Sequence, residues 1–129
     1  MGKKFLVDTN ILIYYFGDQI PGSSLNEIES IFSNSFNISF VTKIEFLGWN
    51  RHTEKGYHLA EEFLEPANIV FMTDAVLDLT IDLKRKYTIK LGDAIIAATA
   101  LINKMTLVTR NKDDFKNIRG LNIFNPYED

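Results

Sequence analysis

The chain has 129 residues, 46% of them hydrophobic and 24% charged, which suits one globular domain that folds without a disulfide or a structural metal. It contains no cysteine, which excludes thiol chemistry and cysteine-based metal sites, and its net charge of −3 argues against nucleic-acid binding through bulk positive charge. The sequence lacks the pattern of a secretory signal and an apolar run of about 20 residues, so we expect a cytoplasmic protein without membrane association.

Hydrophobic periodicity in the first half of the chain predicts short strands that alternate with helices. The apolar run Phe5–Val7 reads as a buried strand, and a short helix over 11–16 follows it. A second helix is expected over about 24–34, a second strand over 36–41, and a third helix from Thr42.

The second half continues the same alternation and ends on two strands. A short apolar strand between two helices is typical of a parallel sheet that is covered on both faces. The sequence therefore predicts a helix-rich α/β fold with about five strands. The expected elements are a helix over about 54–64, a strand at 69–71, a helix ending near 86, a buried helix over 93–102, and strands at 106–108 and 121–124.

Four acidic residues are predicted at one edge of this sheet. Asp8 follows the first strand, Glu45 lies shortly after the second, Asp93 opens the buried helix, and Asp114 follows the fourth strand. The carboxyl ends of parallel strands and the amino ends of the following helices share one edge, which is where ligands bind in such folds.

Each acid also has a purely structural interpretation. Thr42 and Glu45 have the spacing of a capping box, and an acid in the first turn of a helix, such as Asp93, interacts favourably with the helix dipole. Asp113 competes with Asp114 as an exposed acid. Asp8 is the hardest to explain in this way, because a carboxylate at the end of a buried strand is costly to desolvate without a partner.

Convergence of these four acids favours a metal site over separate structural roles. Clustered carboxylates raise one another's pKa unless a divalent cation neutralises them. Oxygen ligands without histidine or cysteine select Mg²⁺ or Mn²⁺. Such an ion polarises a phosphodiester and lowers the pKa of a bound water, so the pattern predicts phosphodiester hydrolysis.

Five motifs in the chain resemble, in order, those of PIN-domain nucleases. They run from residue 6 to residue 127, and the short single-domain form is similar to the VapC-like toxins of bacterial and archaeal toxin–antitoxin pairs. The motifs are LVDTN at 6–10, VTKIEFL at 41–47, LGDAIIAATA at 91–100, LVTRNKDDF at 107–115 and IFNPY at 123–127.

The resemblance implies a three-layer α/β/α PIN-like domain over residues 1–129 that acts as an Mg²⁺- or Mn²⁺-dependent endoribonuclease. It also implies a homodimer, an RNA substrate and a small antitoxin protein as partner. It assigns catalytic and metal-ligand roles to Asp8, Glu45, Asp93 and the acid of the fourth motif. Relatives place that last acid where either Asn111 or Asp114 stands, so we predict Asp114 as the ligand, with Asn111 holding a water, and the number of ions stays open.

Polar and basic residues beside the acids are the candidates for supporting and RNA-binding roles. Thr9 and Asn10 are expected to support the loop at Asp8. Lys43, Arg110 and Lys112 flank the acids in sequence and are predicted to contact RNA phosphates, although solvated surface charge is the alternative for each.

Two other functions compete with the ribonuclease. A catalytically weak, RNA-binding PIN-like module would follow if Asn111 weakens the last metal position. A phosphatase of the haloacid dehalogenase type or a receiver domain also places aspartates after parallel strands, but the sequence around Asp8 lacks the second acid that each requires.

Overall fold

The computed structural model of the protein describes residues 3–127. Its five strands form one parallel sheet in the order β3–β2–β1–β4–β5, which confirms the predicted sheet. The central position of β1 places the residue that follows it in the middle of the sheet edge. The strands are β1 (Phe5–Val7), β2 (Asn37–Ser39), β3 (Asn68–Val70), β4 (Thr106–Val108) and β5 (Ile123–Phe124).

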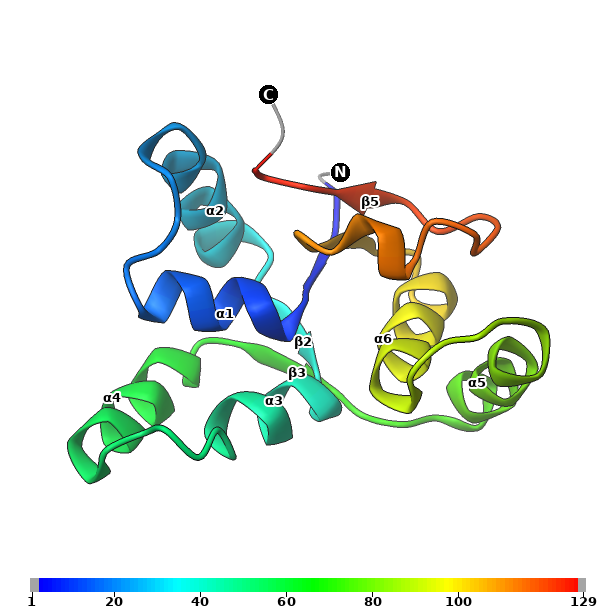
Figure 1. Cartoon of the computed structure of the whole chain (residues 1–129), viewed down its shortest axis with the longest axis horizontal. Coiled ribbons are helices and arrows are strands. Elements are labelled where there is room, and N and C mark those ends of the chain that lie inside the picture. Colours follow the sequence, from blue (N-terminus) through cyan, green and yellow to red (C-terminus); the bar gives the residue numbers. More distant parts are fainter. Residues whose placement is uncertain (1–2, 128–129) are drawn as a thin grey trace.

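Helices cover both faces of the sheet, as Figure 1 shows, and the predicted three-layer α/β/α fold is confirmed. Helices α5 and α6 contribute to the core on one face, and α1 to α4 contribute to the core on the other. No helix within residues 3–127 is long and apolar enough to cross a membrane. The helices are α1 (Thr9–Phe16), α2 (Gly22–Asn34), α3 (Phe40–Leu47), α4 (Glu54–Leu64), α5 (Asp74–Lys86), α6 (Leu91–Ile102) and the 3₁₀ helix η1 (Lys112–Asp114).

The two central strands show why the short apolar runs are strands. Leu6 and Leu107 pack in the core under α5 and α6, while their neighbours Val7 and Val108 pack in the core under α1 to α4. Successive side chains of a strand point to opposite faces, so a strand covered on both sides must be apolar throughout. The register pairs Leu6 with Leu107 and Val7 with Val108. The residues that follow the two strands therefore leave the sheet side by side.

The third helix begins two residues earlier than predicted. Ser39 accepts a hydrogen bond from the backbone N–H of Val41 at 3.2 Å and caps α3, so β2 ends at Ser39 and the strand expected over 36–41 is too long. The capping box expected between Thr42 and Glu45 is wrong for the same reason. Helix α6 likewise begins at Leu91, which places Asp93 inside its first turn.

Candidate active site

Asp8 lies at the carboxyl end of β1, where its backbone N–H bonds to Val108 and it caps the start of α1. Its side chain is 5% exposed. One carboxylate oxygen, Oδ1, accepts from the backbone N–H of Thr9 at 2.8 Å, and the other, Oδ2, accepts from the hydroxyl of Thr109 at 2.7 Å. Two donors on two different elements therefore fix the orientation of this buried carboxyl group.

The surroundings of Asp8 disfavour the charged form of its carboxyl group. Burial raises the pKa of Asp8 to about 6, the hydrogen bond from Thr109 opposes that rise, and the nearby charges of Asp93 and Glu45 add to it. A positive ion at this place would relieve both the burial and the repulsion.

Glu45 projects from the second turn of α3 toward α1 and α6. Its Oε1 accepts a hydrogen bond from the hydroxyl of Thr9 at 2.6 Å. Thr9 Oγ1 also lies 3.1 Å from Thr42 Oγ1, and since a hydroxyl has one proton, Thr42 donates to Thr9 while Thr9 donates to Glu45. On the other side, a Cβ atom at Gly92 would lie 3.5 Å from Glu45 Oε2, an ordinary contact distance that places the start of α6 against this carboxylate.

Asp93 and Asp114 bring the third and fourth carboxyl groups to the same edge. Burial raises the pKa of the half-buried Asp93, the charges of Asp114 and Glu45 raise it further, and the ammonium group of Lys90 lowers it. Asp114 ends η1 and is exposed. The structure thus links all four predicted acids electrostatically through Asp93, which interacts with each of the other three.

The four carboxyl groups nevertheless do not stand at the spacing of ligands around one ion. Within residues 3–127, no three acidic or histidine side chains are close enough to share a metal. Glu45 and Asp114 are the exposed members of the set, and Asp8 and Asp93 are the more buried ones. The donor set itself, carboxylates with threonine hydroxyls behind them, fits Mg²⁺ or Mn²⁺.

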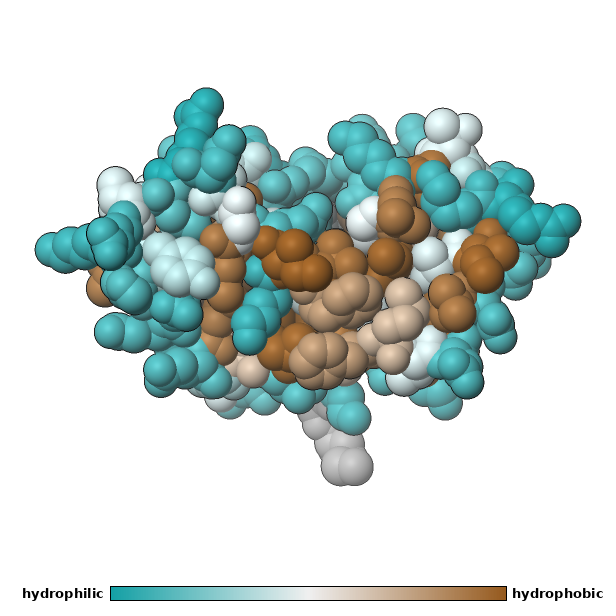
Figure 2. Space-filling view, turned by 90° about the horizontal axis from the view of Figure 1, so that it is seen from below, coloured by the Kyte–Doolittle hydropathy of each residue, from teal (hydrophilic) through white to brown (hydrophobic). Residues whose placement is uncertain are grey.

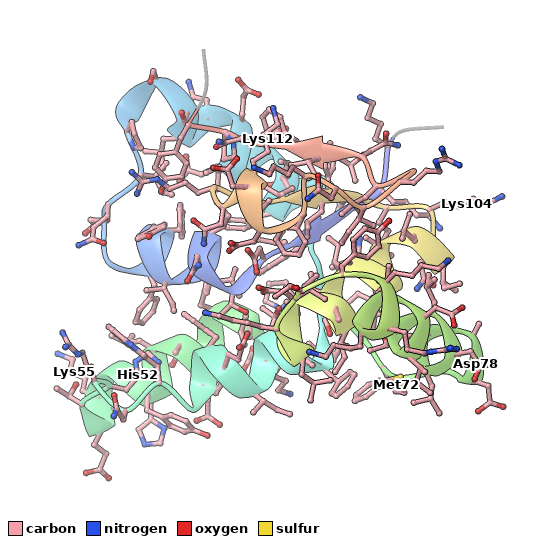
Figure 3. The ribbon with its side chains drawn as sticks, turned by 45° about the vertical axis from the view of Figure 1, so that its right-hand side comes forward. His52, Lys55, Met72, Asp78, Lys104 and Lys112 are labelled. Carbon is pink, nitrogen blue, oxygen red and sulfur yellow. The ribbon has the colours of Figure 1, made fainter. Side chains whose placement is uncertain are left out.

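The predicted RNA-binding residues separate into two groups. Arg110 is stacked on two rings, with its guanidinium carbon 4.5 Å from the centre of Tyr127 and 5.3 Å from that of Tyr14. Arg110 and Lys112, the latter labelled in Figure 3, line a hollow of 290 Å³ together with Asp114. Lys43 lies in a different hollow, between α3, α4 and β3, whose lining includes Glu61 and Glu65 but none of the four acids.

The residues predicted to support the site, Thr9, Asn10 and Asn111, lie close in sequence to Asp8 and Thr109. Thr9 connects Asp8 to Glu45, although it does so as the first residue of α1 and not from a loop. Asn10 is the next residue of that helix, and the backbone N–H of Asn111 donates to Thr109 Oγ1 at 3.0 Å.

Sequence reasoning missed Thr109, Thr42 and the two tyrosines under Arg110. Thr109 had a readable signal, because it follows β4 as Asp8 follows β1, and adjacent parallel strands bring such residues together. Thr42 was assigned to a helix cap and faces Thr9 instead. Nothing local links Tyr14 or Tyr127 to Arg110, since the three residues lie far apart in the chain.

Comparisons with known proteins place these features in a family. A family described as PIN domain matches residues 5–121. Ribonuclease VapC1 of Methanocaldococcus jannaschii is 29% identical over 130 residues, which cover 95% of this chain and 88% of that protein. A chain of a toxin–antitoxin complex from Klebsiella pneumoniae is 31% identical with a TM-score of 0.76, covering 98% of this chain and 100% of its own. A chain of the DNA-bound VapBC complex from Salmonella typhimurium, 23% identical, has the same fold, with a TM-score of 0.82 and coverage of 97% and 99%.

Proposed function

This chain belongs to the PIN domain family, and from that membership we propose that it is a metal-dependent endoribonuclease, the toxin of a toxin–antitoxin pair. The observation that carries the proposal is the buried carboxyl group of Asp8, held by two hydrogen bonds among three further acids at the sheet edge. The charged form of such a buried group is costly, and a bound cation would offset that cost.

We assign the metal to Asp8, Glu45, Asp93 and Asp114, with Mg²⁺ or Mn²⁺ as the ion. When bound, the ion polarises the phosphodiester and makes a bound water acidic. Thr109 and Thr9 orient Asp8 and Glu45 through the hydrogen bonds described above. Arg110, which lies against two tyrosine rings, contacts an RNA phosphate next to the acids, and Lys112 acts from the same hollow.

The proposed partners are an RNA substrate in the cytoplasm, a small antitoxin protein and a second copy of the chain. The antitoxin is inferred from the similarity to a chain of a toxin–antitoxin complex at 31% identity. An exposed apolar surface favours a second copy of the chain as a partner.

The apolar face is a group of six exposed hydrophobic side chains on neighbouring elements. Figure 2 shows hydrophobic side chains gathered across the middle of the underside of the molecule. Exposed apolar surface of this kind marks a protein interface. The residues are Ile44 on α3, Phe71 and Met72 before α5, Leu77 and Ile81 on α5, and Leu91 at the start of α6.

Charge on α5 favours a second copy of the chain as the occupant of the apolar face. Residues four apart share one side of a helix, so Leu77, Ile81 and Arg85 form one stripe, which Asp74 extends at the amino end. When two copies of this stripe pack antiparallel about a two-fold axis, Leu77 meets Ile81 of the other copy and Asp74 meets Arg85 of the other copy. The stripe is therefore complementary to itself, as an isologous dimer requires.

The ribonuclease proposal is tested by incubating the protein with single-stranded RNA and Mg²⁺ or Mn²⁺. We expect cleavage that EDTA abolishes and that Asp8→Asn reduces at least about a hundredfold, the scale of losing one catalytic metal ligand. Asp82→Asn, an exposed acid on α5, is the control and should retain activity. Cleavage that persists in EDTA or in Asp8→Asn would contradict the proposal, and RNA binding without cleavage in Mn²⁺ would favour the weak RNA-binding module.

The adjacent acids Asp113 and Asp114 allow a second comparison within the same assay. If Asp114 is the fourth ligand, Asp114→Asn lowers the rate far more than Asp113→Asn, because the two changes remove the same charge one residue apart. Equal losses would instead indicate a general electrostatic effect of η1.

A further inference from the structure

Two hollows lie on either side of the acidic pair in η1. Both are lined by Asp113 and Asp114. The smaller, of 290 Å³, holds Arg110 and Lys112 as described above. The larger, of 830 Å³, lies between residues 113–118 and the connection from α5 to α6, which are orange and yellow-green in Figure 1. We call this larger space the lysine hollow.

Three lysines line the lysine hollow, and they have different roles. Lys84 Nζ donates to the backbone oxygen of Ile89 at 2.5 Å and so shapes the connection between the helices. Lys86 and Lys90 are exposed, and their ammonium groups make no hydrogen bond or ion pair with any part of the chain that the structure describes, although Lys90 is near enough to Asp93 to lower the pKa of that acid. Their ammonium groups are therefore available to a ligand.

The net charge of the lysine hollow depends on whether the acids in its lining bind a divalent cation. The three lysines are balanced by Asp93, Asp113 and Asp114 along the same lining. Once Asp93 and Asp114 share a divalent cation, the balance turns positive and the hollow attracts an anion. This step rests on the proposed metal-dependent function.

The remaining lining of the lysine hollow combines apolar and aromatic residues with the polar Thr88 and Asn117. Tyr87, Ile89 and Ile118 contribute to it, and Tyr87 and Ile118 are anchored in the core under α5 and α6. A volume of 830 Å³ lies within the range of small-ligand sites, about 300–1,000 Å³. Lysines beside a fixed aromatic wall match a ligand that carries both a phosphate and a planar base.

We propose that the lysine hollow binds the nucleotide on one side of the scissile phosphate, with Lys86 and Lys90 contacting backbone phosphates and Tyr87 contacting the base. The strand then crosses the acids and leaves past Arg110 in the smaller hollow. Two hollows that contain basic side chains and share the same two aspartates thus make one path for a single strand across the proposed metal site.

The test measures binding and salt dependence separately from cleavage. The double variant Lys86→Ala/Lys90→Ala is compared with Lys55→Ala/Lys104→Ala, which removes the same charge at two distant places that Figure 3 labels. Both pairs are made in the Asp8→Asn background, and fluorescence anisotropy follows a labelled single-stranded RNA in Mg²⁺ over a series of salt concentrations. We expect about tenfold weaker binding for the first pair and a salt slope that is lower by about 1.4, the value for two phosphate contacts on a single strand.

The same two pairs in the active background give the second readout. The pair in the lysine hollow should raise KM with kcat little changed, and Lys86→Arg/Lys90→Arg should restore most of the affinity because charge is the requirement. Equal effects of the two pairs on affinity and slope would overturn the proposal, even if the protein cleaves RNA. If no variant cleaves RNA but the first pair still loses affinity, the ribonuclease function fails and the lysine hollow stands as an RNA site.

Discussion

At the residue scale, the site depends on hydroxyl groups that hold carboxylates in place. Thr109 and Thr9 donate to Asp8 and Glu45, and Thr42 supports Thr9 from behind. Residues behind a metal ligand fix its orientation and basicity, so such hydrogen bonds matter almost as much as the ligands. Each threonine lies in a different segment of the chain, and the arrangement forms only when α1, α3 and β4 are packed together.

Asp8 makes the stability of the metal-free protein depend on pH. The folded-state pKa of about 6 lies above the unfolded value of 3.8, so the folded state binds the proton more tightly. The contribution of Asp8 to the free energy of unfolding is therefore largest below pH 3.8 and falls as the pH rises through about 6, by about 3 kcal/mol in all.

Asp8→Asn removes that pH dependence, because an amide does not ionise. In EDTA, we expect the variant to be more stable than the natural protein at pH 8, by up to about 3 kcal/mol, and nearly equal to it at pH 4. Urea denaturation at the two pH values measures the difference. An equal gain in stability at both pH values would show that the folded protein does not disfavour the charged form of this carboxyl group.

Thr9→Val tests the support of Glu45. The change removes the hydroxyl that donates to Glu45 Oε1 and keeps the shape of the side chain. We expect Mn²⁺ affinity to fall about tenfold by isothermal titration calorimetry, the size seen when a residue behind a metal ligand is lost. Thr80→Val is the control, since that buried hydroxyl donates only to a carbonyl of its own helix; a similar loss of affinity there would argue against a specific role for Thr9.

At the scale of the elements, four different helices or helix starts contribute one acid each to the site. Asp8, Glu45, Asp93 and Asp114 come from the start of α1, the middle of α3, the start of α6 and the end of η1. The existence and order of these elements could be predicted, because strands and helices have different hydrophobic periods. The start of α3 could not, because Ser39 and Thr42 are both acceptable capping residues and only packing selects between them.

The end of α3 offers a test of how tightly that helix is placed. Gly48 follows α3, and a Cβ atom there would lie 2.6 Å from the backbone oxygen of Ile44, so the helix end must shift to accept a side chain. We expect Gly48→Ala to lower the free energy of unfolding by about 1–3 kcal/mol.

Gly22→Ala is the matched control for Gly48→Ala. No atom lies within 4 Å of a Cβ at Gly22, in the first turn of α2. Alanine should be neutral there or slightly stabilising, because it restricts the unfolded chain and favours the helix. Urea denaturation measures the free energy of unfolding of both variants. Equal stability of the two would contradict the close approach at Gly48.

At the scale of the whole molecule, two surfaces meet near the start of α6. Leu91 belongs to the apolar face, and Asp93, two residues later, belongs to the acidic edge. A second copy docked on the apolar face would therefore bring its own acidic edge close to the first. The arrangement would give two neighbouring sites for one RNA.

The proposed dimer predicts a change of oligomeric state. Ile81→Glu places a charge in the centre of the self-complementary stripe, and we expect it to give a monomer by sedimentation velocity while urea stability changes little. Leu59→Glu, a comparably exposed position on α4 outside the apolar face, is the control and should leave the dimer intact.

The charged ends of the stripe provide a second, independent comparison. Arg85→Glu should weaken the dimer by setting two acids opposite each other, and adding Asp74→Arg should recover part of the loss. A natural protein that is already monomeric, or a dimer that none of these changes affects, would exclude the proposed interface.

The sequence by itself determined the alternation of strands and helices, the parallel sheet and the position of each acid relative to its own element. These features follow from hydrophobic periodicity and from chain geometry within a few residues. Only the tertiary structure decided that Thr109 holds Asp8, that Thr9 holds Glu45, and that Arg110 rests on Tyr14 and Tyr127. Such contacts join residues up to 101 positions apart in the numbering, and side-chain partners at that separation are set by sheet register and helix packing, which no local pattern encodes.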